Sequence, residues 1–373
     1  MHDLRIIRNE DFDLFTKENN LKDLSQFGNN FFYELDPSKI IVNEDLFSLP
    51  SLKLRNFVNI VVNLPKATIH GNKLATIYNG YLLPSGYSHS FNWVEVNGFN
   101  YIDEFRCYGE SFREIDISNE GFEYFILGIT SHFGHFFVDG LDRLMAFDRL
   151  VKNIKNVRFI VDAIPSAHIM KIINLLGIKV VESNFVILEN YVDYKLNDLK
   201  VSSLNSAKPA ISLESFKEFR SRAIKSIDSQ VNDKTRGIYV GRKNVEKRSV
   251  VNQSEIETYL SSIGISSYYP EENNFEETIA KFNSVDIVII VIGSGKFNLS
   301  LCRPGTKVIC LTPLAYVENS GPVSIMLRQL CFIFKLHLCF CSCEIVGLNY
   351  GLNSDLRIDI NSLKASLKTL EIF

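Results

Sequence analysis

The sequence predicts an α/β protein built from two doubly wound domains, with a β-rich portion at its N-terminus. Apolar runs of strand length alternate with helical patterns over residues 124–181, and the alternation resumes over residues 237–334. Residues 1 to about 110 instead carry short strand-like runs between Gly, Asn and Pro signals. Because strand–helix–strand alternation builds parallel sheets with helices on both faces, each alternating stretch predicts a domain.

Length and charge fit this division and exclude one class of function. The chain has 373 residues, which is enough for two domains of ordinary size. It carries 40 basic and 43 acidic residues, for a net charge of −3. Nucleic-acid binding needs a clustered basic excess that neutralises phosphates, so we expect no nucleic-acid partner.

The N-terminus and the cysteines predict a cytoplasmic protein. The first residues include acids and lack the apolar core of a signal peptide. The longest apolar run, residues 285–293, is far shorter than the ~20 residues of a membrane helix, although peripheral contact with the inner membrane stays open. Seven cysteines, an odd number, are expected to be reduced thiols. Cys339, Cys341 and Cys343 lack the C-x-x-C spacing of zinc sites, so we interpret them as core residues of one strand.

Local patterns place the elements of the N-terminal domain, residues 1–210. Helix 134–152 has apolar residues at helical spacing, and helix 165–176 begins with a proline and ends before Gly177. Strand-like runs cover residues 57–64, 67–70, 76–83, 90–96, 124–129, 157–161 and 178–181.

A long helix and a charged segment lead into the C-terminal domain, residues 230–373. Helix 252–263 is expected to start with Asn252 as its cap and Glu255 as the capping-box partner. The other expected helices are 212–229, 274–283 and 321–334, and the expected strands are 237–240, 265–269, 286–292 and 307–311.

A first candidate site follows the strand at residues 124–129, where residues 131–144 read SHFGHFFVDGLDRL. His135 and Asp139 are four residues apart, so a regular helix would place them on one face, with Arg143 one turn further on. An imidazole or a carboxylate there could accept a proton as a general base. The alternatives are a local Asp139–Arg143 pair and histidines that bond backbone groups; a zinc site is less favoured because no matching Cys/His pair stands nearby.

Two further candidates lie in the C-terminal domain. The turn GSGKFN, residues 293–298, follows a buried strand and opens a helix, whose first N–H groups attract phosphate. Arg242 follows the strand at 237–240, at the edge where ligands bind in open α/β sheets. Together with Arg248 it could hold a diphosphate. The alternatives are an ordinary turn with Lys296 in solvent, and a solvated basic loop, which is how we interpret Lys243 and Lys247.

Residues 131–144 also resemble the H-x-x-x-D segment of glycosyltransferase family 61, which includes bacterial capsule and lipopolysaccharide transferases and plant xylan-decorating enzymes. Further resemblances follow in the family's order, over about residues 120–315. They lie at residues 239–242 (Y-x-x-R), at Arg248 with Asn252 and Glu255, at 275–277 (F-x-E), at 286–298 (an apolar strand, a glycine turn and an Asn) and at 303–309 (P-G-T-K).

The resemblance implies the GT-B architecture, in which two Rossmann-like domains face a cleft. It implies an inverting transfer of a sugar from a nucleotide-sugar donor, with a UDP-sugar favoured, to a glycan or lipid-linked glycan acceptor. The pathway would be capsule, lipopolysaccharide O-antigen or other surface polysaccharide biosynthesis. No cofactor or metal is expected, because no D-x-D motif flanked by strands stands out and Asp193-Tyr-Lys is not one.

The resemblance also implies roles for individual residues. Asp139 or His135 would take the proton of the acceptor hydroxyl, and Arg143 would orient Asp139. The donor would bind against Arg242, Arg248, Glu277, Gly293, Ser294, Gly295, Lys296 and Asn298.

The sequence departs from the family at two places. Ser294–Lys296 replaces a usual His-Gly-Ala, and Cys310 replaces a usual acid that can hold the donor ribose. These departures motivate a first rival, a non-catalytic nucleotide-binding protein of a glycan-assembly pathway. A second rival is an epimerase or dehydrogenase, which is disfavoured because no G-x-G-x-x-G follows an early strand.

Overall fold

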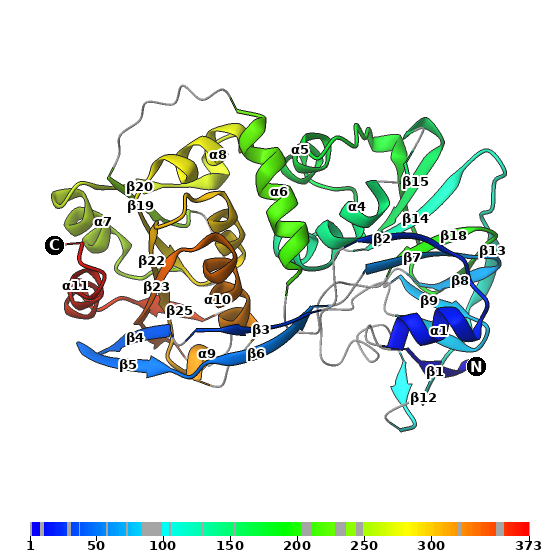
Figure 1. Cartoon of the computed structure of the whole chain (residues 1–373), viewed down its shortest axis with the longest axis horizontal. Coiled ribbons are helices and arrows are strands. Elements are labelled where there is room, and N and C mark those ends of the chain that lie inside the picture. The colour runs from blue at the N-terminus through cyan, green and yellow to red at the C-terminus, as the bar shows by residue number, and fades with distance from the viewer. Residues whose placement is uncertain are drawn as a thin grey trace. The chain divides into compact units, whose positions relative to one another are not determined.

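The computed structural model is a mixed α/β structure of two compact units (Figure 1). It describes all residues except 1, 8–10, 28–30, 37, 57–58, 72–73, 84–98, 104–105, 129, 149, 152–153, 203–210, 228–235, 244–248, 319–321, 348–353 and 373. The first unit comprises residues 1–32 and 55–215, and the second comprises residues 33–54 and 216–373. Each unit has its own sheets and core, so each is described by itself.

A six-stranded sheet forms the α/β part of the first unit. Its strand order is β16-β15-β14-β18-β7-β2, and the first four of these strands run parallel. Helix α5 (Ala167–Leu175) connects β15 to β16, with Ser166 as its N-cap. The strand bounds are β2 Asp23–Phe27, β7 Asn59–Leu64, β14 Glu123–Gly128, β15 Val157–Val161, β16 Phe185–Ile187 and β18 Leu199–Ser202.

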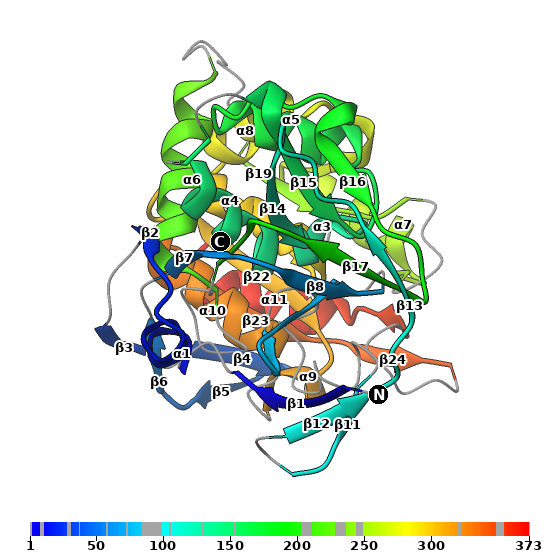
Figure 2. The same ribbon diagram turned by 90° about the vertical axis from the view of Figure 1, so that its right-hand side faces the viewer.

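An eight-stranded sheet accounts for the β-rich start of the chain. Its order is β11-β12-β1-β10-β9-β8-β17-β13, and Figure 2 shows β8 beside β17. Apolar side chains of both sheets and of helix α1 (Phe12–Glu18) form one core cluster, which includes Val62, Ile69 and Ile126. The strand bounds are β1 His2–Ile6, β8 Ala67–His70, β9 Ala75–Tyr78, β10 Tyr81–Leu83, β11 Asn100–Tyr101, β12 Arg106–Gly109, β13 Arg113–Asp116 and β17 Val192–Leu196.

A buried His–Asp pair joins β8 to β17 in this sheet. The Nδ1 atom of His70 lies 2.6 Å from Oδ1 of Asp193, and both side chains are almost completely buried. The other carboxylate oxygen accepts the N–H of Phe112, whose ring stacks on the imidazole at 4.6 Å. Asp193 therefore has a structural role, because it links β17 to His70 of β8 and to the backbone of Phe112.

Two strand predictions for the first unit were wrong. Residues 178–181 form no strand because side chains take their N–H groups: Val180 donates to Asn174 and Val181 donates to Asn184. The run 76–83 is a hairpin of β9 and β10 rather than one strand, since Asn79 and Gly80 both have positive φ and turn the chain. The expected strand 90–96 lies outside the described residues.

The second unit is built on a seven-stranded sheet of order β20-β19-β21-β22-β23-β4-β5. All pairs are parallel except β4–β5. Counted along the chain from β19, the first five strands have the doubly wound order 2-1-3-4-5. Their bounds are β19 Gly237–Val240, β20 Ile265–Tyr268, β21 Ile287–Val291, β22 Lys307–Thr312 and β23 His337–Ser342.

Helices cover both faces of this sheet (Figure 1). One face packs on α7 (Gln253–Ser262) and α11 (Ile360–Thr369) in a single core cluster. The other carries α8 (Phe275–Ser284), the 3₁₀ helix η6 (Ser294–Leu301) and α10 (Pro322–Phe334). Remaining elements are α6 (Leu213–Lys225), α9 (Ala315–Glu318), and the pair β24 (Glu344–Val346) and β25 (Asp355–Arg357).

Asn252 stands at the N-cap position of α7, as predicted, but the predicted capping box does not form there. Its side chain does not cap α7; instead its amide pairs with the backbone of Ile358, accepting at 3.1 Å and donating at 2.8 Å. A complete capping box stands at the next helix, α8. There Asn274 accepts the N–H of Glu277, and Glu277 accepts the N–H of Asn274, both at 2.9 Å.

An N-terminal hairpin completes the sheet of the second unit. β4 (Ser38–Val42) pairs parallel with β23, and β5 (Asp45–Leu49) pairs antiparallel with β4. The segment is flanked by β3 (Phe31–Leu35) and β6 (Leu52–Asn56), which form a two-stranded sheet. Residues 33–54 thus belong to the second unit rather than to the N-terminal domain predicted over 1–210, since no local pattern signals this long-range pairing.

All seven cysteines are buried, and none of them forms a disulfide. Cys339 and Cys341 lie on β23 and pack with Cys343 in the core cluster, which confirms their interpretation as core residues. No helix in the described part of the chain is long and apolar enough to span a membrane.

We predict that the protein loses stability above about pH 9. Burial raises the pKa of Cys339 to about 11 and that of Cys341 to about 12. A group whose pKa is higher when folded stabilises the fold below its unfolded pKa, and this contribution disappears as the pH rises through the folded value. The urea midpoint should therefore fall between about pH 8 and about pH 10. A midpoint that stays constant over this interval contradicts the prediction.

Candidate functional site

The loop after β14 lies at a topological switch point of the six-stranded sheet. β14 has β15 on one side and β18 on the other, so the chain connections leave in opposite directions. Ligands of open α/β sheets bind outside the carboxyl ends of the strands at such a point. Asp162, at the end of β15, holds this loop by accepting the N–H groups of Thr130 and Ser131 at 2.7 and 3.1 Å.

The helix that follows is not regular. Residues 133–135 are α-helical, residues 136–140 form one wide π turn, and α4 continues over Leu141–Asp148. Gly140 permits this turn, because a Cβ there would lie 2.9 Å from the ring of Phe136. The regular helix expected over 134–152 was therefore wrong at 136–140, and His135 and Asp139 do not stand in the α-helical register assumed for them. π turns inside helices occur frequently at functional sites.

Asp139, Asp142 and Arg143 form a buried charged group on this helix. All three are at most 2% exposed. The guanidinium donates from Nη1 to the carbonyl oxygen of Leu127 at 3.1 Å, next to a bulge in β14. Burial lowers the pKa of Arg143, while the charges of Asp139 and Asp142 favour its protonated form. Arg143 thus ties the helix to the strand that precedes it.

Asp142 connects this group to the start of α6. Its Oδ1 accepts the hydroxyl of Ser215 at 2.6 Å, and that hydroxyl in turn accepts from Ser212 at 3.0 Å. Ser215 and Asp162 are functional candidates that the sequence patterns do not predict. A local signal existed only for Asp162, an acid directly after a buried strand.

The histidines lie at the accessible side of the loop. His132 is exposed and His135 is half-buried, with their ring centres 5.5 Å apart. Of the three residues predicted as catalytic, His135, Asp139 and Arg143, only His135 has appreciable exposed surface. His135 is therefore the member of the three that a ligand in solution can reach.

The second unit has a switch point of its own between β19 and β21. Val240 and Ile290 are paired neighbours, so the loop that starts at Gly241 and the turn at residues 293–295 leave adjacent strand ends. Arg242 and the turn that opens η6 therefore follow neighbouring strands of the same sheet. Arg248 falls outside the described residues, so its predicted role stays a prediction.

The turn into η6 buries polar side chains. Lys296 is 6% exposed, and its Nζ lies 4.4 Å from the ring centre of Phe297, which excludes the alternative of a lysine in solvent. Asn298 is 4% exposed, and its Oδ1 has no hydrogen-bond partner among the described residues. Burying an unmatched polar atom is unfavourable, so a ligand that donates a hydrogen bond here would relieve the cost.

The loop after β19 is fastened on both sides. Arg242 is half-buried, whereas Lys243 is exposed and pairs with Glu272 at 2.9 Å, as expected for a surface residue. Tyr269 packs beside the loop, and its hydroxyl is held by Glu257 and by Gln253. A Cβ at Gly241 would lie 2.6 Å from the ring of Tyr269.

We predict that Gly241→Ala destabilises the second unit by about 1–3 kcal/mol, because the ring of Tyr269 cannot move without leaving Glu257. The free energy of unfolding, measured by urea denaturation, checks this. Gly295→Ala is the matched control: its Cβ would lie an ordinary 3.6 Å from Ile290, so its stability should stay near that of the parent. Equal losses in both variants would refute the steric argument.

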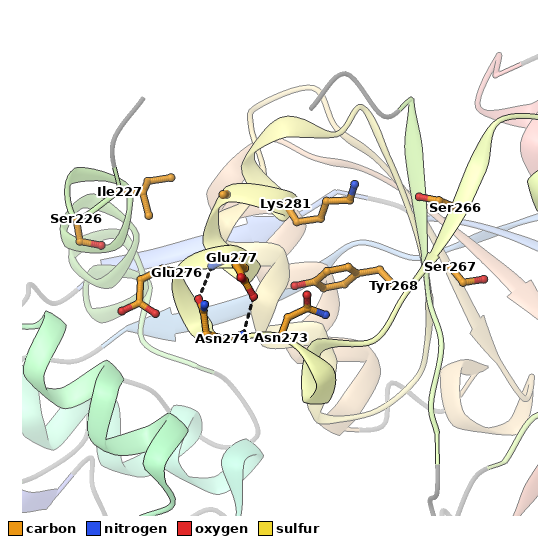
Figure 3. A pocket seen from close by; sticks show the side chains of 11 residues that line it. Ser226, Ile227, Ser266, Ser267, Tyr268, Asn273, Asn274, Glu276, Glu277 and Lys281 are labelled. Atoms are coloured by element: carbon orange, nitrogen blue, oxygen red, sulfur yellow. Dashed lines mark hydrogen bonds between the residues drawn. The ribbon is translucent and has the colours of Figure 1, made fainter. Parts of the chain in front are cut away.

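Glu277 lies apart from these loops. Its carboxylate takes part in the capping box of α8 and lines a pocket of about 650 Å³ (Figure 3). Neither Arg242 nor any residue from 293 to 298 lines this pocket. In the described part of the chain, no three His, Cys, Asp or Glu side chains gather as they would around a metal ion.

Comparison with known families agrees with the motifs. Residues 133–309 match the family model described as Glycosyltransferase 61. The match begins at the loop of His135 and extends through η6 into β22, so it includes both switch points. No curated protein matches the sequence.

Proposed function

Since residues 133–309 match the model of glycosyltransferase family 61, we propose that the protein moves a sugar from a nucleotide-sugar donor to a hydroxyl of a glycan or lipid-linked glycan. The family match supports a glycosyltransferase. The nucleotide-sugar donor, the inverting course and the GT-B arrangement are parts of the proposal, and the motif resemblance supports them.

One observation carries the proposal. The two segments with candidate chemistry each lie at the carboxyl edge of a parallel sheet, at the point where the strand order reverses. The loop after β14, with His132 and His135, lies at this point in the first unit. Arg242 and the turn that opens η6 lie at the corresponding point in the second unit. Because ligands bind at such an edge, each unit can hold one of the two substrates.

We assign the donor to the second unit. Its diphosphate would lie against the first N–H groups of η6 and the side chains of Lys296 and Arg242. As the bond from the anomeric carbon to the phosphate oxygen breaks, negative charge develops on the departing nucleoside diphosphate. Fixed cations and backbone N–H groups stabilise such charge without reorganising. This supports the metal-independent course, together with the lack of a strand-flanked D-x-D motif in the sequence.

We assign proton removal to the first unit. The acceptor hydroxyl attacks the anomeric carbon from the face opposite the nucleotide, and its proton passes to a ring nitrogen of His135. His135 is preferred over Asp139 because it is accessible, whereas Asp139 is completely buried beside Arg143. Asp139 is then a positioning residue of the loop.

The resemblance extends the proposal to a UDP-sugar donor and to surface polysaccharide synthesis, as in capsule or O-antigen pathways. The proposal includes either a hexosyl or a pentosyl group as the transferred sugar. The work would be done in the cytoplasm or at the inner face of the membrane, as the odd number of cysteines leads us to expect.

A thermal-shift screen of nucleotide sugars tests the donor assignment. A ligand that binds only the folded state raises the melting temperature, and Arg242→Ala should reduce that rise. The same ligand is then given to the protein with EDTA, and release of the nucleoside diphosphate is measured. Binding without release would favour the rival of a non-catalytic protein, which the buried thiol of Cys310 motivates: burial raises its pKa, so it cannot supply the charge of an acid. No shift with any nucleotide sugar would refute the donor assignment.

A further inference from the structure

A pocket beside the edge strand of the second unit stands apart from the two switch points. Its volume is about 650 Å³, within the range of small-molecule sites. Strand β20 ends the seven-stranded sheet among the described strands, and α8 and the end of α6 form the other walls. Lining residues are Ser226, Ile227, Ser266, Ser267, Tyr268, Asn273, Asn274, Glu276, Glu277, Ala280 and Lys281.

Three polar side chains of the pocket are held in place before any ligand arrives. The capping box fixes Asn274 and Glu277, each through one hydrogen bond of 2.9 Å. Asn273 donates from its Nδ2 to the carbonyl oxygen of Tyr269 at 2.8 Å. Each of these bonds uses only part of the capacity of an amide or a carboxylate. Donors and acceptors in fixed positions therefore remain for a ligand.

The floor of the pocket is equally rigid. The hydroxyl of Tyr268 lies 3.0 Å from the hydroxyl of Thr278, and its ring packs edge-on against Phe282. Figure 3 shows the side chains of Tyr268, Asn273 and Glu277 turned toward one another. An aromatic edge beside fixed amides and a carboxylate presents both apolar and polar surface to one ligand.

We propose that this pocket binds a glycosyl unit of a glycan, at a subsite separate from the donor loops. The lining contains two carboxylates and one ammonium group, so it disfavours phosphates and other anions. Most of the pocket surface is apolar, with fixed amides and a carboxylate set into it. A neutral ring with several hydroxyls satisfies paired donors and acceptors and places its C–H face on the apolar part of the lining. The identification of the ligand as a glycan rests on the proposed function, but the pocket's preference for neutral polyols does not.

The test uses the full-length protein and neutral trisaccharides of glucose, galactose and xylose, observed by saturation-transfer NMR. Wild type should bind at least one of them. Ser266→Tyr places a ring in the pocket from β20 and should weaken binding about tenfold, and Asn273→Ala should do the same through a lost hydrogen bond. Ser261→Tyr, on the exposed face of α7, is the matched control and should bind as wild type does. Far-UV circular dichroism confirms that each variant is folded.

Binding of UDP, measured on the same variants, separates this pocket from the donor site. We expect UDP affinity to stay unchanged in Ser266→Tyr. Loss of UDP binding there would mean that the pocket holds the nucleotide, and the inference would fall. It would also fall if no trisaccharide bound wild type, or if both pocket variants bound normally. Sugar transfer without trisaccharide binding refutes only this inference, whereas trisaccharide binding without transfer refutes only the proposed activity.

Discussion

His135→Ala should lower the rate of sugar transfer by about 10²–10⁴-fold, the usual contribution of a general base. The imidazole is half-buried at the carboxyl edge of β14, on a loop that Asp162 fixes through two N–H groups. Its loss removes the proton acceptor but leaves the second unit untouched. Steady-state kinetics should show the change in kcat, and a thermal-shift titration should show unchanged donor affinity.

His132→Ala is the matched control for this experiment. Its ring lies 5.5 Å from that of His135 and is exposed, so its removal should change kcat little. Asp139→Asn tests the other candidate base. If Asp139 only positions the loop, the pH profile of kcat should still show the titration of His135. If His135→Ala turns over normally and Asp139→Asn is inactive, the proton goes to Asp139 and our assignment is wrong.

Arg143→Met should destabilise the protein by about 3–5 kcal/mol, the cost of removing one partner from a buried charged group. The side chain is completely buried between two carboxylates and bonds the carbonyl oxygen of Leu127. Without the guanidinium, Asp139 and Asp142 remain buried without their cation. Urea denaturation at neutral pH measures the effect.

Arg143→Lys separates charge from geometry. An ammonium restores the positive charge but cannot reproduce the planar fork of a guanidinium, so part of the stability should return. Asp142→Asn in the Arg143→Met background should also recover stability, since it removes one of the two uncompensated charges. A loss below about 1 kcal/mol in Arg143→Met would show that the group is not the anchor we describe.

The α/β alternation could be predicted from the sequence because its signals are local. Strands 67–70, 157–161 and 237–240 were placed with the bounds that the structure has. Each is a short apolar run between turn residues, and burial on both faces produces that pattern. The glycine turn after β21 and the arginine after β19 could be located for the same reason.

The wrong predictions of local structure arose where side chains change the backbone hydrogen bonding or accompany an irregular turn. Hydrophobic periodicity shows neither effect. Asparagine side chains took the N–H groups of Val180 and Val181, so an apolar run became a loop. The ring of Phe136 packs against Gly140 and accompanies a π turn where a regular helix was expected. The pattern of residues 131–144 does not show which polar side chains are buried, and only the fold distinguishes the buried Asp139 from the accessible His135.

The parallel pairing of β4 with β23 has a consequence for how the protein is made. Residues 39–41 leave the ribosome 300 residues before their partners at 339–341. Until then the edge of β23 does not exist, and the early hairpin has no sheet to join. The second unit can thus complete its fold only after β23 has been synthesised. A fragment that starts at residue 216 would leave β23 with an open edge, the kind of edge that promotes aggregation.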